Sequence, residues 1–424
     1  MRRFRIILVA AIATTVLMAS AQKFAATKTS SVSAPPSSVT GSRAPPAPSG
    51  LGAGPPPMHA DDDAQPELQG PRMLHGNSRH THRGSGRVPQ SEPIVAWSRE
   101  LGGPIEAQVV ASPDGQTLYV ASLGGTLTAL ASTDGSIRWS VALGDRSYAT
   151  PCVGDDGTVF VGSDARKLIA VSPDGAVKWS LDTDGDADTG PVIAGDGNIV
   201  FAAGRTVMEV SARGQVAWRF AAKRKVFTSP AIGFSGRIFF GSQDHHAYAL
   251  SPAGQLVWSR DLGADVDGAP ALGDDGAVFI GTDADDVVRL DPDDGHIVWR
   301  ARTDGYVRGT ISVARNGDVL AGVYGPTPRA VRLRASDGAR VGDFAIQGTG
   351  ARDFGVHGGA LEDAAGALLF GAQDDSVYAV GETGKLLWRV KAAGDVDAPI
   401  TLLSDSTMIV GSDDGFVRAL RERR

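Results

Sequence analysis

Short apolar runs separated by tight-turn signals recur along most of the chain. One set of runs ends in a small residue, as in Val159–Gly162 and Val278–Gly281, and a second set follows about ten residues later, as in Leu168–Val171. The runs are rich in β-branched and aromatic side chains, which favour strands. Pairs such as Asp156-Gly157 lie between them, and Asp-Gly supplies the positive φ of tight hairpins. The pattern therefore predicts consecutive β-hairpins.

Tryptophan marks the period of the pattern. Successive tryptophans are 39 to 42 residues apart, except for a last interval of 89 that spans two periods. The vacant place falls near 342–344, where Phe344 is expected to substitute. The seven residues, expected to pack between neighbouring repeat units, are Trp97, Trp139, Trp179, Trp218, Trp258, Trp299 and Trp388. Both sets of apolar runs have eight members, so the sequence predicts eight four-stranded antiparallel units arranged as an all-β, eight-bladed β-propeller.

The count of strands predicts how the ring closes. Seven complete units run from about Ile105 to residue 392, and the eighth has only three strands, near 399–403, 407–411 and 416–420. A strand with its own tryptophan, Ile94–Trp97, precedes the first unit. Pairing this strand with the last three removes two exposed sheet edges. We therefore expect a 3 + 1 closure of the last blade by the N-terminal strand.

The first 92 residues differ in composition from the repeats. A basic start, an apolar run from Ile6 to Ala19 and a small-residue site predict a signal peptide over 1–21, and hence a periplasmic or secreted protein. Residues 22–92 are rich in Pro, Ala, Ser and Gly and predict a disordered linker. His75, His80 and His82 within it are expected to be solvated. The propeller is assigned to 93–424.

Composition and charge exclude several classes of function. The net charge is −7, whereas general nucleic-acid binding requires a basic face. Cys152 is the single cysteine, which excludes an internal disulfide framework and Cys-based zinc or iron–sulfur sites. Glycine, at 54 of 424 residues, fits a chain with many turns.

The repeat resembles a known family. The pattern Asp-Gly-x-Val-Phe-Val-Gly-Ser, followed by Leu-x-Ala-Val and a tryptophan, as in 156–179, is similar to the repeat of pyrroloquinoline-quinone (PQQ) propellers. That superfamily includes quinoprotein dehydrogenases and non-catalytic BamB-type proteins of outer-membrane assembly. The chain lacks the vicinal disulfide of many such dehydrogenases, and no tryptophan is left over as a platform for a quinone. It also lacks the lipobox cysteine of the BamB group, which puts lipid anchoring in doubt.

Other catalytic signals are weak. No Gly-x-Ser-x-Gly elbow, His-Glu-x-x-His motif or phosphate-binding loop is present. The acidic segment 182–188 has Ala187 and Ile193 where an EF-hand would need Gly and Glu. We therefore expect no catalytic residue, no metal and no cofactor.

The loops before the first strand of each blade carry one variable position per repeat. In a propeller the first strand is innermost, so these loops reach one mouth of the axial channel. The eight residues, called here the mouth ring, are Glu106, Tyr148, Asp188, Phe227, Asp267, Arg308, His357 and Asp397. Their mixed chemistry suggests binding of a partner segment or small ligand, while solvated loop side chains are the alternative.

Two functional interpretations remain open. The first is a non-enzymatic, monomeric scaffold that binds a protein partner in the cell envelope or a small ligand, with a possible link to outer-membrane protein assembly implied by the resemblance. Loop tips such as 241–244 would then add docking surface. The second is a PQQ- and calcium-dependent quinoprotein dehydrogenase. Nucleic acid is not expected as a partner, and membrane association is expected only if the N-terminal segment stays uncleaved.

Overall fold

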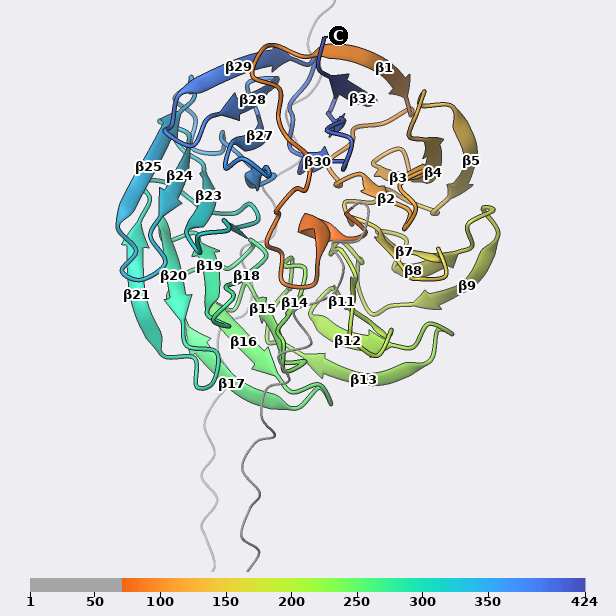
Figure 1. Ribbon diagram of the computed structural model, residues 1–424. Coiled ribbons are helices and arrows are strands. Elements are labelled where there is room, and N and C mark those ends of the chain that lie inside the picture. The colour runs from red at the N-terminus through yellow and green to blue at the C-terminus, as the bar shows by residue number, and fades with distance from the viewer. Residues whose placement is uncertain (1–70, 424) are drawn as a thin grey trace, which may run out of the picture. The chain divides into compact units, whose positions relative to one another are not determined.

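The computed structural model describes residues 71–423, so the expected signal peptide and the linker up to residue 70 lie outside the described part. Eight four-stranded antiparallel sheets form a ring, with the first strand of each blade nearest the axis and the fourth on the rim (Figure 1). The predicted eight-bladed propeller is confirmed. Between residues 71 and 423, no helix has the length and apolar character needed to cross a bilayer.

The strands of the first four blades are β2 (Val110–Ala111), β3 (Thr117–Ser122), β4 (Thr126–Ala131), β5 (Ile137–Ala142); β6 (Cys152–Val153), β7 (Val159–Ser163), β8 (Lys167–Val171), β9 (Val177–Asp182); β10 (Val192–Ile193), β11 (Ile199–Ala203), β12 (Thr206–Val210), β13 (Val216–Ala221); β14 (Ala231–Ile232), β15 (Ile238–Gly241), β16 (His246–Leu250) and β17 (Leu256–Asp261). Those of the last four are β18 (Ala271–Leu272), β19 (Val278–Thr282), β20 (Asp286–Leu290), β21 (Ile297–Arg302); β22 (Ser312–Val313), β23 (Val319–Val323), β24 (Arg329–Leu333), β25 (Arg340–Ala345); β26 (Leu361–Glu362), β27 (Leu368–Ala372), β28 (Ser376–Val380), β29 (Leu386–Lys391); β30 (Thr401–Leu402), β31 (Met408–Gly411), β32 (Phe416–Arg421) and β1 (Ile94–Glu100).

The eighth blade closes as predicted. Its strand order is β1-β32-β31-β30, so the N-terminal strand is the outer strand of a sheet whose other members end the chain. β1 pairs antiparallel with β32, with Ile94 opposite Arg421 and Trp97 opposite Ala419. The register shifts just before Trp97, and the same irregularity occurs between the third and fourth strands of all eight blades. β1 therefore takes the place of a regular fourth strand.

The core lies between the blades. The second and third strands are buried along nearly their whole length, whereas the outer strands alternate between exposed and partly buried positions. Six of the seven tryptophan rings cover a turn of the next blade. Trp218, for example, donates its indole N–H to the carbonyl of Pro252 at 3.0 Å, and a Cβ on Gly254 would lie 2.3 Å from its ring. Gly254 also has a φ of +72°, so both the turn and the close approach require glycine.

The blade without a tryptophan differs from the prediction. Gly342, opposite Arg332, occupies the register position of the missing ring, so Phe344 does not substitute for it directly. Phe344 instead packs two residues further on, with its ring 5.6 Å from that of Tyr378. Gly384, in the turn that an indole at position 342 would cover, has nothing within 4 Å of an added Cβ. Phe220, two residues after Trp218, makes the same kind of contact with Tyr248, so the contact of Phe344 does not replace the ring, and the turn at Gly384 stays uncovered.

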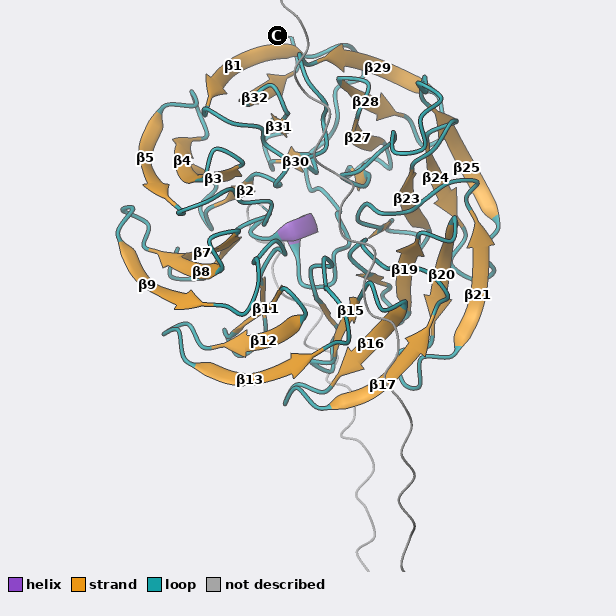
Figure 2. Ribbon diagram, turned by 180° about the vertical axis from the view of Figure 1, so that it is seen from behind, coloured by secondary structure: helices purple, strands orange, loops and turns teal. Residues whose placement is uncertain are grey.

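The expectation that residues up to 92 form a disordered linker is wrong for the part that the structure describes. Residues 71–92, the N-terminal strap, begin at the centre of the ring, where a short 3₁₀ turn, η1 (Leu74–Gly76), appears in both views, and run outward to β1 on the rim (Figures 1 and 2). Seven N–H groups at the ends of first strands donate to strap carbonyls; the donors are Ala111, Val153, Ile232, Leu272, Val313, Glu362 and Ala364. The strap is ordered because it satisfies these inner-strand donors.

The three strap histidines are buried, contrary to the expectation that they are solvated. His75 and His80 have no exposed surface and His82 has 2 %. His80 Nδ1 lies 2.8 Å from the Pro270 carbonyl, and His82 Nε2 lies 3.0 Å from that of Ile400. Burial lowers the pKa of His80 and of His82 to about 4, so both imidazoles are neutral at pH 7. Their stacked or angled rings fill the axis instead of binding solvent.

Candidate functional site

The mouth ring forms at the end of the propeller where the fourth strand of one blade leads into the first strand of the next. Its members come from eight loops, and side chains of neighbouring loops interact across the blade boundaries. Arg308 forms a bidentate ion pair with Asp283 at 2.6 Å, and Lys225 lies 3.1 Å from Asp188. The predicted column is therefore a set of side chains around one mouth, whereas its role in binding stays a prediction.

A second set of residues, which sequence reasoning missed, supports the mouth ring. These residues occupy the turn between the second and third strands, and each interacts with the mouth-ring residue of the next blade. The pairs are Asp164 with Asp188, Gln243 with Asp267, Asp283 with Arg308, Tyr324 with His357, Gln373 with Asp397, and Asp413 with Glu106. The available signal was a variable residue directly after a Gly-Ser or Gly-Thr strand end, as in Asp164, Gln243, Asp283 and Asp413.

The aromatic members of the mouth ring are engaged by basic side chains. Lys225 lies 4.2 Å from the centre of the Phe227 ring, and the guanidinium of Arg146 lies 5.6 Å from that of Tyr148. His357 accepts or shares a hydrogen bond with the Tyr324 hydroxyl. Phe227 remains 36 % exposed, so one large apolar group of the ring faces solvent.

Carboxyl groups dominate the charge of the mouth. Burial raises the pKa of Asp188 and of Asp267 to about 6, with added repulsion from neighbouring aspartates. Burial together with the charges of Asp413 and Asp397 raises the pKa of Glu106 to about 7. These raised pKa values indicate that the basic side chains near these carboxyl groups do not fully compensate their negative charge.

Three of the acids lie especially close together. One carboxylate oxygen from each of Asp395, Asp397 and Asp413 lies within 4.8 Å of the others; this group is called the acidic trio. Asp395 and Asp397 belong to the loop between β29 and β30, and Asp413 to the turn between β31 and β32. The Asp413 N–H donates to the Asp395 carbonyl at 2.9 Å, which holds the two loops together.

Neutralising one member of the trio should stabilise the fold at alkaline pH. Burial and the charges of Asp397 and Asp395 raise the pKa of Asp413 to about 6, so its ionisation costs folding energy above pH 6, and that cost disappears as the pH falls towards 4. We expect Asp413→Asn to stabilise the protein by about 1 kcal/mol at pH 8 and by much less at pH 5, after allowance for partial exposure. Chemical denaturation in metal-free buffer at both pH values measures this, with the exposed Asp184→Asn as control. An equal effect at both pH values would contradict the assignment.

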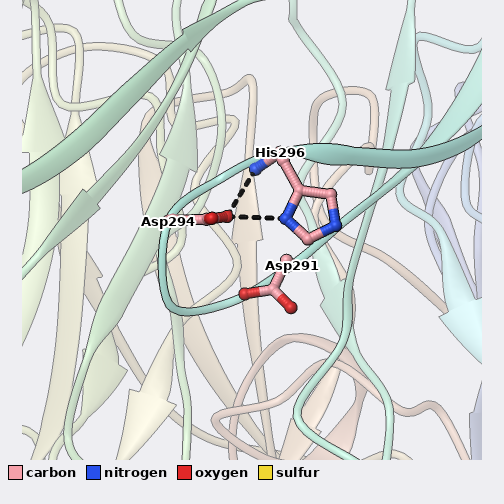
Figure 3. Close-up of side chains that lie close together, drawn as sticks. All are labelled: Asp291, Asp294 and His296. Carbon is pink, nitrogen blue, oxygen red and sulfur yellow. Dashed lines mark hydrogen bonds and ion pairs between the residues drawn. The ribbon is translucent and has the colours of Figure 1, made fainter.

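A second cluster of possible ligands lies in the turn between β20 and β21. Asp291, Asp294 and His296 bring their polar atoms together there (Figure 3). Asp294 and His296 are exposed, and Asp294 Oδ1 accepts from the His296 N–H at 2.9 Å and lies 2.8 Å from its Nδ1. These local bonds account for the geometry of the turn.

The single cysteine is not available as a nucleophile. Cys152 lies in β6 with no exposed surface, and burial raises the pKa of its thiol, which disfavours the reactive thiolate. All seven tryptophans donate their indole N–H to a main-chain carbonyl, six of them in the next blade and Trp388 to Pro89 of the strap. Their structural inter-blade role is therefore seen directly.

The repeat, the 3 + 1 closure and the variable mouth define a PQQ-like β-propeller. A family model described as outer membrane protein assembly factor BamB matches residues 94–156, 148–252 and 243–341, more than half of the chain. The chain belongs to this family.

Solved structures show the same fold at low sequence identity. BamB from Moraxella catarrhalis is 19 % identical, with a TM-score of 0.63 over 78 % of this chain and 98 % of that one. A europium-containing methanol dehydrogenase is 13 % identical, with a TM-score of 0.68 over 83 % and 92 %. The computationally designed Ika8 protein is 15 % identical, with a TM-score of 0.65 over 77 % and 99 %. No curated protein sequence matches the chain.

Proposed function

We propose that this chain is an exported, non-enzymatic scaffold of the cell envelope that contributes to outer-membrane protein assembly through its mouth. The observation that carries the proposal is the match of the BamB family model across 94–341. The rigid ring of blades would present the mouth loops to a partner segment, in keeping with the usual placement of binding residues on loops of a stable scaffold. The predicted signal peptide and a periplasmic location agree with this role.

The chemistry of the mouth favours a scaffold over a quinoprotein dehydrogenase. PQQ is a planar quinone that carries carboxylate groups, so it needs basic partners and a stacking platform. Here the basic residues Arg146, Lys225 and Arg308 already pair with Asp164, Asp188 and Asp283. Every tryptophan donates its indole N–H to a main-chain carbonyl of the next blade or, for Trp388, of the strap. The residues present therefore do not fit the cofactor, which supports the scaffold over the dehydrogenase.

Site-specific photo-cross-linking tests the proposal. A photoreactive residue replaces Phe227, which is 36 % exposed in the mouth, and the matched control replaces Ile137, which is 52 % exposed on the rim. We expect a cross-link to a component of the outer-membrane assembly machinery in intact cells from position 227 and not from position 137. A combined Asp267→Ala, Arg308→Ala and His357→Ala variant should lose it, whereas Arg334→Ala with Asp337→Ala, an exposed ion pair, should keep it.

Two results would contradict the scaffold proposal. One is an unaltered cross-link in the triple variant once circular dichroism has shown that it is folded. The other is a bound-quinone spectrum with alcohol- or sugar-dependent dye reduction after incubation of the purified protein with PQQ and Ca²⁺, which would establish the dehydrogenase instead.

A further inference from the structure

The acidic trio concentrates negative charge without an ionic partner. Among the described residues, no Lys, Arg or His forms an ion pair with Asp395, Asp397 or Asp413, although ion pairs are frequent elsewhere on the propeller. The nearby Asp414 shows the contrast, because Arg418 pairs with it directly. Like charges brought together in a partly buried site repel each other unless a cation compensates them.

Asp397 provides the second, independent observation. It is only 8 % exposed, yet its Oδ1 has no hydrogen-bond partner among the described residues. Asp413 Oδ1 also lacks a hydrogen-bond partner there. The other oxygen, Asp397 Oδ2, accepts a hydrogen bond from the Gln373 amide at 3.1 Å, which fixes the orientation of the carboxylate. A buried carboxylate oxygen without a donor is costly, so an oriented and unsatisfied one at the centre of an acidic group points to a missing positive ligand.

The donor set selects the kind of ion. All three ligands are carboxylates, and hard oxygen donors favour Ca²⁺ or Mg²⁺ over zinc or copper. Two oxygens bound to one Ca²⁺ at about 2.4 Å lie at most about 4.8 Å apart, whereas Mg²⁺ limits that separation to about 4.2 Å. The trio oxygens lie within 4.8 Å of one another, so a small shift of the side chains brings all three to one Ca²⁺, which tolerates irregular geometry better than Mg²⁺ does.

We infer that Asp395, Asp397 and Asp413 form a calcium site that joins the seventh and eighth blades at the mouth, in the absence of any quinone. Glu106, on the adjacent loop of the first blade, lies close enough for the charges of Asp413 and Asp397 to act on its carboxyl group. The ion would bridge the loop after β29 and the turn after β31, next to the blade that the N-terminal strand completes. This inference goes beyond the scaffold role and does not depend on it.

Calcium titration of the purified full-length protein tests the site. After treatment with a chelator, isothermal titration calorimetry with CaCl₂ should give one saturable site with a dissociation constant of about 1 mM or tighter. Tb³⁺ should show luminescence sensitised by protein aromatic groups and displaced by Ca²⁺. Asp397→Asn, which keeps the shape and the Gln373 contact, should weaken binding at least about tenfold. Asp294→Asn, in the exposed cluster of Figure 3, should bind as the unaltered protein does.

Each alternative result overturns the inference. Absence of saturable binding at several millimolar Ca²⁺ would do so, as would unchanged affinity in Asp397→Asn. Loss of binding in Asp294→Asn would place the ion in the other cluster. Should Asp397→Asn fail to fold, Asp413→Asn decides, because Asp413 is partly exposed and its replacement removes repulsion instead of a buried contact. The cross-linking experiment at position 227 and the calcium titration are independent measurements. A negative cross-linking result would contradict the scaffold proposal and leave the calcium result unaffected.

Discussion

A chain that begins at Val88 is expected to melt roughly 7 °C below a chain that begins at Pro71. The shorter chain keeps β1 and the Pro89 carbonyl that accepts from Trp388, but it loses the seven hydrogen bonds from first-strand N–H groups to the strap. At about 0.5–1.5 kcal/mol net for each bond, the loss is on the order of 5 kcal/mol before side-chain contacts are counted. Differential scanning calorimetry of the two chains measures the effect.

A pair of point variants tests the same feature without truncation. The Arg83 guanidinium donates to both carboxylate oxygens of Asp274 and to the carbonyls of Val313 and Ala314, so it links the fifth and sixth blades. Arg87 is exposed, and its side chain makes no hydrogen bond within the described residues. We expect Arg83→Ala to be clearly destabilising and Arg87→Ala to be neutral. Equal melting of the two truncated chains, together with equal melting of these variants, would show that the strap is dispensable.

Acid should weaken the strap. The pKa values of His80 and His82 are lowered to about 4 in the folded state, against about 6.5 in an unfolded chain. The contribution of these neutral imidazoles to the free energy of unfolding is therefore fully present above pH 6.5, and it is lost as the pH falls towards 4. The difference in stability between the chains that begin at Pro71 and at Val88 should accordingly shrink between pH 7 and pH 5.

Proline at position 419 is expected to open the ring. Ala419 is fully buried in β32, between Ile409 of β31 and Trp97 of β1. Proline removes a main-chain donor and is not tolerated in a central strand, so Ala419→Pro should cost about 3 kcal/mol or more. Because β1 has no covalent link to the rest of its blade, its release should follow. Hydrogen exchange of residues 94–100 should then lose protection, with a new protease-sensitive site there.

The seventh blade offers a matched control. Ala379 occupies the same position in β28, opposite Trp388, and is also fully buried. Ala379→Pro should destabilise to a similar degree and leave residues 94–100 protected, because the strands of that blade are consecutive in the chain. If β1 stays protected in Ala419→Pro, or is exposed equally in both variants, the closure does not depend on the pairing of β1 with β32.

The features that follow from counting the repeats could be predicted from the sequence, and the contacts made by the strap could not. Blade number, strand order and the 3 + 1 closure follow from the spacing of Trp97 to Trp388, because each repeat has the same kinds of turn residue and packing residue at the same positions. The mouth ring followed from the same alignment. Its partners in the second turns, among them Asp164 and Asp283, were missed because nothing in the sequence shows that these turns reach the mouth loop of the next blade.

The strap could not be predicted because its order has no local cause. Residues 71–92 contain prolines, glycines and isolated polar groups, and His75, His80 and His82 even adopt positive φ, which is uncommon for non-glycine residues. Their conformation is set by partners far away in the sequence, such as Ile400 for His82. Composition indicates whether a segment can bury enough of its own apolar surface to fold by itself. The strap does not fold by itself, because the blades supply the residues against which it packs.

The position of both closing segments before the first blade sets the order of folding. Ile94 pairs with Arg421, and His82 contacts Ile400, a separation of 318 residues. Contacts of such range are slow to form, and they cannot form until the end of the chain has been synthesised or translocated. Until then β1 has no partner strand, and its edges are open to pairing with other chains. Closure of the ring by the last residues therefore competes with aggregation during biogenesis. Chaperones that shield strand edges should act late in this process.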